Sequence, residues 1–317
     1  MKNLSLTRCT LSLGSAAALF AGCGASQPPI GAPGLIAQTS AIATQAAHGG
    51  SWMLPEAKSQ DLLYISDFYG VHVFSYPKGV HVGDIGGFAS PEGLCSDRAG
   101  NVFITDDIAR HVYEYAHGGT SPINVLYDNY IDFNPFDCSV DPTTGNVAVA
   151  TPDLPSIVIF PDAQNRPIAY SDPYSIIFWC AYDDQGNLFV ERVRHHRKFY
   201  IGELPKGATK FRNLLLDARV ADPSALKFDG RHVVVEDLNA STLYQLRFSG
   251  SSAIVIGTTA LSGAKQIEQF WIQNSRVIGP DAYGSVYFWK YPAGGSPVKS
   301  IQGFTLPDGS TVSLAPN

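Results

Sequence analysis

The sequence has little charge and lacks the residue patterns that mark common enzymes. Asp, Glu, Lys and Arg make up only 16% of its 317 residues. It contains no Gly-Xaa-Ser-Xaa-Gly elbow, phosphate-binding loop, dinucleotide fingerprint or His-Glu-Xaa-Xaa-His pair. No catalytic residue is therefore predicted, and the sequence favours a protein that is not an enzyme without deciding the question.

Positive charge is scarce as well. The chain has 22 Lys and Arg residues against 28 Asp and Glu residues, a formal net charge of −6. An acidic surface repels the phosphates of nucleic acids and of anionic lipids. We therefore exclude nucleic acid as a partner and expect no direct binding to an anionic membrane.

The N-terminus has the features of a bacterial export signal. Lys2 and Arg8 supply positive charge, and the apolar run over residues 11–20 is too short to span a bilayer. The run leads into Leu-Phe-Ala-Gly-Cys23, which resembles the lipobox of bacterial lipoproteins. The resemblance implies that residues 1–22 are a lipoprotein signal peptide and that Cys23 is lipidated.

The segment after Cys23 has the composition of a flexible linker, because residues 24–50 contain no charged residue. We expect a tether over residues 23–57 and one globular domain over residues 58–317. The protein would be exported and lipid-anchored to the cell envelope, with the anchor as its only membrane contact. Gly24 in place of Asp favours the outer membrane if the host has two membranes.

Cysteine is too rare in the globular part for a disulfide framework. Once Cys9 and Cys23 are set aside, Cys95, Cys138 and Cys180 remain, and three is an odd number. We expect these three to be small buried thiols.

Two sequence patterns recur six times in the globular part. The first is an apolar stretch that ends in a polar or charged residue, and the second is an alternating stretch closed by an aromatic residue or Leu and a turn. Successive end residues lie 39 to 45 positions apart in both patterns. The first pattern occupies residues 63–67, 102–106, 147–151, 188–192, 233–237 and 277–281, and the second ends at Tyr76, Tyr115, Phe160, Leu204, Phe248 and Tyr291.

Each repeat has room for four antiparallel strands, and an Asp followed by a Gly-containing turn precedes the first pattern in four repeats. Four strands in about 40 to 45 residues form one propeller blade. We predict an all-β, six-bladed β-propeller with four antiparallel strands per blade. Residues 303–314 resemble the start of the second blade at residues 87–96, so we expect the C-terminal strand to complete the first blade.

Residues 91–106 resemble the NHL repeat, and weaker copies begin at Pro135, Phe178 and Pro223. NHL-repeat proteins are six-bladed propellers used mostly for binding, and some carry enzymatic activity. The resemblance supports the predicted fold and only broadly suggests a binding role.

A binding site is expected on the face where the loops between second and third strands meet the segments that lead into each blade. The fourth repeat carries a three-residue insertion that forms a cationic finger, a candidate docking point for an anionic ligand. The candidate ligand-binding residues are Arg192, Arg194, His195, Arg197 and Lys198 on the finger, with Tyr174 and Trp179 beside it.

Glu92, Asp137 and Asp308 are weaker candidates for a metal site at the channel mouth, where carboxylates could hold a Ca²⁺-like divalent cation. Gluconolactonase-type propellers, a more distant resemblance, bind a divalent metal there with Asn from Pro-Asn-Gly turns. The sequence contains no Pro-Asn-Gly. No other cofactor is expected.

The recurring Asp67, Asp106, Asp237 and Asp281 are expected to bind turn backbone rather than substrate. The preferred hypothesis is an envelope-anchored, non-catalytic binding or scaffolding propeller that uses its channel-mouth face. Its partner would be a protein, a glycan or a small anionic ligand, and we expect a monomer. The alternative is a metal-dependent, lactonase-type hydrolase.

Overall fold

The computed structural model describes residues 50–128, 133–153, 156–171, 175–194 and 198–316. The chain divides into two units, residues 1–36 and 37–317. All the described residues belong to the second unit. The predicted signal peptide and the predicted lipidation site, Cys23, lie outside the described residues.

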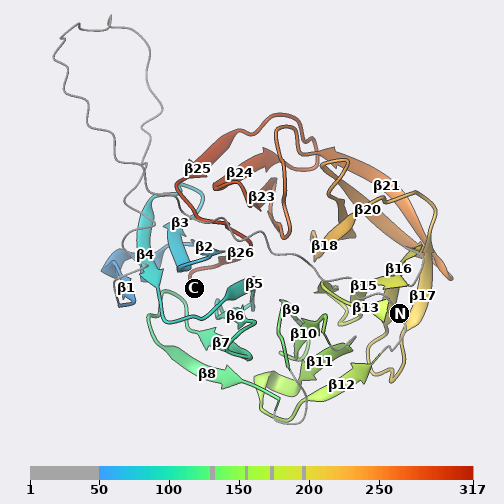
Figure 1. Ribbon diagram of the computed structural model, residues 1–317, viewed down its shortest axis with the longest axis horizontal. Coiled ribbons are helices and arrows are strands. Elements are labelled where there is room, and N and C mark those ends of the chain that lie inside the picture. Colours follow the sequence, from blue (N-terminus) through green and yellow to red (C-terminus); the bar gives the residue numbers. More distant parts are fainter. Residues whose placement is uncertain (1–49, 129–132, 154–155, 172–174, 195–197, 317) are drawn as a thin grey trace, which may run out of the picture. The chain divides into compact units, whose positions relative to one another are not determined.

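The second unit is built from strands that form sheets around a common centre (Figure 1). Its helical content is limited to two short 3-10 turns in the described ranges, η1 (Pro55–Ser59) and η2 (Pro161–Ala163). Four of the five sheets have four or five strands, all paired antiparallel.

In order across each sheet, these four consist of β1 (Trp52–Met53), β4 (His81–Ile85), β3 (Gly70–Ser75), β2 (Leu62–Asp67) and β26 (Ser310–Ser313); β5 (Pro91–Ser96), β6 (Val102–Asp106), β7 (His111–Tyr115) and β8 (Pro122–Leu126); β12 (Ile168–Ser171), β11 (Ser156–Phe160), β10 (Val147–Thr151) and β9 (Asp137–Val140); and β22 (Trp271–Gln273), β23 (Arg276–Asp281), β24 (Ser285–Lys290) and β25 (Lys299–Gln302).

The fifth sheet has nine strands and joins two antiparallel sets. One set contains β13 (Ser175–Ile176), β14 (Cys180–Tyr182), β15 (Leu188–Arg194), β16 (Lys198–Leu204) and β17 (Arg212–Leu216). The other contains β18 (Pro223–Phe228), β19 (Val233–Asp237), β20 (Thr242–Ser249) and β21 (Ser252–Ala260). The two sets pair as strands only where β17 and β21 run parallel, through two residue pairs.

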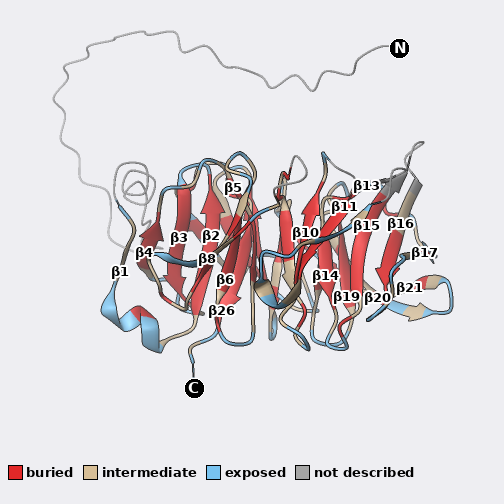
Figure 2. Cartoon of the chain, turned by 90° about the horizontal axis from the view of Figure 1, so that it is seen from below, coloured by how far each residue is buried: buried red, intermediate tan, exposed pale blue. Residues whose placement is uncertain are grey.

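The second strands of the sheets, such as β2, β6, β10 and β19, are buried along both faces because alternate side chains pack against different neighbouring sheets. In β10, Val147 and Val149 belong to an apolar cluster shared with the β5–β8 sheet, whereas Ala148 and Ala150 belong to one shared with β14–β16. The described residues form six such clusters, each shared by two neighbouring sets of strands. Figure 2 shows the buried strands between two rims of more exposed turns.

The sequence patterns fall where they were expected. All six copies of the first pattern lie in the strand next to the innermost one, namely β2, β6, β10, β15, β19 and β23. Gly100, Gly145, Gly186 and Gly230 in the Asp-Gly turns have φ between +75° and +90°, a conformation that Gly adopts without strain. The C-terminal strand β26 pairs antiparallel with β2, with Ile65 opposite Ser310.

Secondary structure begins earlier than the sequence suggested. Trp52 and Met53 lie in the segment predicted as tether, yet they pair with Asp84 and Gly83 of β4. The Trp52 indole N–H also donates to Asp84 Oδ2 at 2.8 Å. These contacts explain why an uncharged, linker-like segment ends in a strand.

Candidate binding face

Two kinds of connection lie at opposite ends of the strands. The loops between second and third strands lie at the same end as the segments that lead into each sheet, and we call this end the loop face. The opposite end, with the Asp-Gly turns, is the turn face. Asp106 demonstrates the first grouping, because its carboxylate accepts from Ala109 in such a loop and from Ala89 and Ser90 in a leading segment.

The recurring aspartates hold the loop face together, as predicted. Asp67 accepts from Tyr69 in its own loop and from Thr305 in the segment that leads to β26. Asp237 and Asp281 make equivalent bonds to their own loops and leading segments. Each of these aspartates is at most 2% exposed, so these loops are fixed by buried, charge-assisted hydrogen bonds.

The loops fixed in this way carry exposed apolar side chains. Phe68 is 67% exposed, Tyr283 68% and Ile108 62%, and each lies one or two residues after an anchoring Asp. Leu306, in the segment that leads to β26, is 60% exposed. We call these four residues the apolar rim. Rigidly held, exposed apolar side chains are typical of surfaces that bind another molecule.

Polar side chains link the sheets across the centre. The Lys227 ammonium lies 3.0 Å from Asp137 Oδ1, and Gln269 Nε2 donates to the same oxygen. Gln269 Oε1 in turn accepts from the backbone N–H of Leu94 and of Ser310. Burial raises the pKa of the Asp137 carboxyl, and the charge of Lys227 opposes that rise.

The metal prediction at the channel mouth gains no support from its three residues. Among the described residues, Glu92, Asp137 and Asp308 do not form a group of ligand atoms within 4.8 Å of one another. Asp137 is already bound by Lys227 and Gln269. Burial and a hydrogen bond with Glu92 raise the pKa of the Asp308 carboxyl well above its usual range. A cation at this mouth stays a prediction.

Two further carboxyls are buried between neighbouring sheets. Glu191 and Glu236 each come immediately before the residue that ends the first pattern, a position where Ser66 and Thr105 donate to a backbone carbonyl of the next sheet. Both glutamates are 1% exposed, and their Oε2 atoms have no hydrogen-bond partner within the described part of the chain. Burial raises the pKa of both carboxyls well above the usual range.

Glu236→Gln should therefore stabilise the protein at neutral and alkaline pH. A carboxyl whose pKa is raised by folding contributes stability below its unfolded pKa and loses it as the pH rises through the folded value. Gln keeps the shape without the charge, so we expect a gain of about 1–3 kcal/mol at pH 8 that disappears below about pH 4. Urea unfolding at several pH values measures it, with the exposed Glu56→Gln as control. A variant less stable than the parent at pH 8 would refute this account of Glu236.

The predicted cationic finger is an extension of the β15–β16 hairpin. Pairing continues to Arg194 opposite Lys198, while His195, Arg197 and the neighbouring candidate Tyr174 lie outside the described residues, as do the side chains of Arg194 and Lys198. Arg192, predicted to bind a ligand from the finger, is instead enclosed by neighbouring strands. Its side chain is buried, its guanidinium donates to Asn213 Oδ1 at 2.5 Å and it lies over the Phe211 ring.

Trp179 lies on the loop face in a group of half-buried aromatic side chains. Its ring centroid is 5.2 Å from that of Phe178 and 5.9 Å from that of Phe136. These residues lead into β14 and β9. The predicted ligand-binding role of Trp179 stays a prediction.

A cavity at the centre opens on the turn face rather than on the loop face, where the candidate site residues were predicted. Its volume is about 490 Å³, and its lining comes from the turn-face ends of five inner strands or the turns that follow them. Lys227 and Trp271 are among the lining residues. The turn face thus offers a concave surface that the sequence patterns did not indicate.

The expectation for the cysteines was wrong for two of the three. Cys95 in β5 and Cys138 in β9 form a disulfide, with Cα atoms 5.6 Å apart. Cys180 is a buried free thiol, as expected. An odd number of cysteines rules out pairing of all three, but it is compatible with one disulfide between the inner strands of neighbouring sheets and one free thiol.

Sequence comparison finds no matching family and no matching curated protein. Structure comparison matches 1127 chains. One belongs to the crystal structure of a nidogen/laminin complex, with a TM-score of 0.68 and 14% identity, and the match covers 81% of this chain and 100% of that one. The fold is a β-propeller. At this identity the propeller likeness carries no information on partner or activity. No helix in the described ranges has the length and apolarity needed to cross a membrane.

A group of three side chains in the first sheet was not predicted from the sequence. His72, His81 and Asp84 lie together there. Strict alternation places residues 81 and 84 on opposite faces of a strand. Only a local irregularity in β4 brings them together.

Proposed function

We propose that this β-propeller is a non-catalytic binding or scaffolding protein that docks a protein partner on its loop face. The observation that carries the proposal is the apolar rim, four large side chains at least 60% exposed on loops fixed by buried aspartates. A surface that is already rigid loses little conformational entropy on binding. A glycan and a small anionic ligand are the other occupants to be distinguished by experiment.

We further propose that the ring has six blades. The nine-stranded sheet divides naturally at the short parallel contact between β17 and β21, and each of six apolar clusters is shared by two neighbouring sets of strands. In this arrangement β26 supplies the innermost strand of the first blade and closes the ring. Closure removes the open sheet edges that would otherwise invite aggregation.

We propose that the chain is an exported lipoprotein, anchored through Cys23 to the cell envelope and related to NHL-repeat propellers. The Cys95–Cys138 disulfide supports export, because such bonds persist in oxidising compartments and are rare in the cytosol. The alternative, a lactonase-type hydrolase with a metal on Glu92, Asp137 and Asp308, has no comparable support.

Loss of the apolar rim should abolish partner binding while leaving the fold intact. We expect Phe68→Asp/Tyr283→Asp to weaken capture of a partner from envelope extracts by at least about tenfold, since exposed aromatic anchors often dominate interface energy. The matched control is Val80→Asp/Leu314→Asp on the turn face, where the side chains are 50% and 46% exposed. Quantitative mass spectrometry of the captured proteins measures binding, and circular dichroism verifies folding. Equal capture by both variants, or loss only in the control, would refute the proposal.

A further inference from the structure

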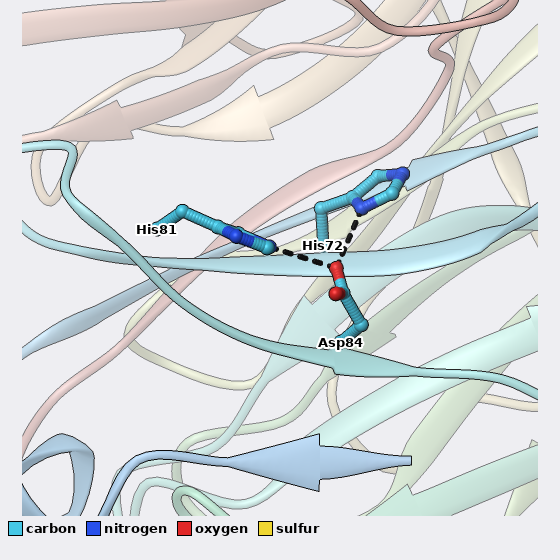
Figure 3. A group of neighbouring side chains, drawn as sticks. All are labelled: His72, His81 and Asp84. Atoms are coloured by element: carbon cyan, nitrogen blue, oxygen red, sulfur yellow. Dashed lines mark hydrogen bonds and ion pairs between the residues drawn. The ribbon is translucent and has the colours of Figure 1, made fainter. Parts of the chain in front are cut away.

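The first sheet contains a compact group of metal-ligating side chains that differ from the three carboxyls considered at the channel mouth. His72 in β3 and Asp84 in β4 are directly opposed cross-strand neighbours. His81, at the start of β4, completes the group (Figure 3). The group does not include any residue of the proposed binding face.

A bulge in β4 brings His81 into the group. Val73 is opposite Gly83 and Phe74 is opposite His81, so Val82 is an extra residue in β4. A β-bulge re-aims the side chains on one side of it, and here it places residues 81 and 84 on the same face. Bulges of this kind are common beside functional sites.

The three side chains meet at one atom. His72 Nδ1 lies 2.7 Å from Asp84 Oδ1, and His81 Nε2 lies 2.8 Å from the same oxygen. All three ligand atoms are within 4.8 Å of one another. Figure 3 shows both imidazole rings directed at this oxygen.

Neighbouring groups contact the atoms of His72 and Asp84 that face away from this point. Asp67 Oδ2 lies 3.1 Å from His72 Nε2, and the Trp52 indole N–H donates to Asp84 Oδ2 at 2.8 Å. A carboxylate on the far nitrogen of a histidine and a hydrogen bond to the far oxygen of a carboxylate are the supports that metal ligands normally have. The side chains of His72 and Asp84 are 0% and 3% exposed, whereas that of His81 is 17% exposed and leaves a path from solvent.

We propose that His72 Nδ1, His81 Nε2 and Asp84 Oδ1 bind one divalent transition-metal ion of the Zn²⁺ class. Two imidazoles and one carboxylate suit Zn²⁺, whereas Ca²⁺ prefers a shell made only of oxygen atoms. Such an ion would join β3 to β4 and, through the bond from Trp52 to Asp84, hold β1 against the sheet.

The test measures Zn²⁺ binding to the full chain by competition with a chromophoric chelator. Cys9→Ser and Cys23→Ser are present throughout, because free thiols bind zinc. We expect one equivalent of Zn²⁺ to bind and His81→Gln to weaken binding at least about tenfold. His232→Gln is the matched control. His232 also pairs with an Asp three residues away, Asp229, but among the described residues no second histidine joins that pair to form a metal-ligating group. Trp52→Phe should weaken binding about tenfold by removing the support of Asp84.

Thermal unfolding keeps the proposal testable if a variant is marginally stable or competes poorly with the chelator. Zn²⁺ should raise the melting temperature of the background and of His232→Gln but not that of His81→Gln, and Ca²⁺ should produce no such difference between the variants. Absence of zinc binding in the background, or equal binding by His81→Gln, would overturn the proposal. Either result would leave the proposed binding face untouched.

Discussion

Lys227→Met is expected to destabilise the propeller by about 3–5 kcal/mol, because it leaves a buried carboxylate without its cationic partner. Lys227 and Asp137 side chains are 6% and 1% exposed, and they join strands 90 residues apart in sequence. The free energy of unfolding in urea measures the effect. The exposed Lys206→Met is the matched control and should change stability by no more than about 0.5 kcal/mol.

A second substitution and the pH distinguish this explanation from a general packing defect. Lys227→Met/Asp137→Asn should recover part of the lost stability, since the amide can still accept from Gln269 without carrying charge but cannot also accept from the backbone N–H of Cys180. The loss in the single variant should also shrink toward acid pH, because a buried carboxyl with a raised pKa takes up a proton there. A double variant as unstable as the single one would show that the charge pair is not the cause.

Cys138→Ala is expected to cost about 4 kcal/mol of stability. The disulfide with Cys95 spans 43 residues, and closing a loop of that length restricts the unfolded chain by about this amount. Urea unfolding of the oxidised parent and the variant measures the difference. Cys180→Ala serves as control because it removes a buried thiol and leaves the bridge in place.

A reductant tests the same bond without a substitution. Dithiothreitol should lower the unfolding midpoint of the parent and of Cys180→Ala, and leave that of Cys138→Ala unchanged. A parent insensitive to reductant during unfolding would contradict the assigned bridge.

The repeat predicted the positions of the strands because each propeller strand is a short apolar segment between turn residues. The role of the anchoring aspartates was also predictable from the sequence, since a residue repeated at one position in several repeats indicates a hydrogen bond that each repeat needs for its structure. Asp106 illustrates this, with three backbone N–H groups on one buried carboxylate.

Contacts that depend on a bulge in a strand could not be predicted from the spacing of residues in the sequence. A bulge in β5 between Pro91 and Leu94 shifts Cys95 relative to the other inner-strand cysteines, so its approach to Cys138 was not predictable from spacing. The contact between His81 and Asp84 was not predictable either, because the bulge in β4 breaks the regular alternation of side chains along the strand.

Burial at a site was also beyond the sequence. Arg192 begins a run of basic residues, and this run predicts that its guanidinium belongs to the cationic finger. Its strand position instead turns it toward Asn213 and Phe211 inside the sheet. A charge run shows the composition of a segment, but the partner strand decides which of its side chains reach solvent.

Site-specific photo-cross-linking in the native envelope tests the central claim most directly. A benzophenone side chain would be placed singly at Phe68 and Tyr283 on the loop face and at Val80 and Leu314 on the turn face, all four of which are exposed positions. We predict that both loop-face positions cross-link to the same protein and that neither turn-face position does. Cross-links confined to the turn face, or spread equally over both faces, would contradict binding through the loop face.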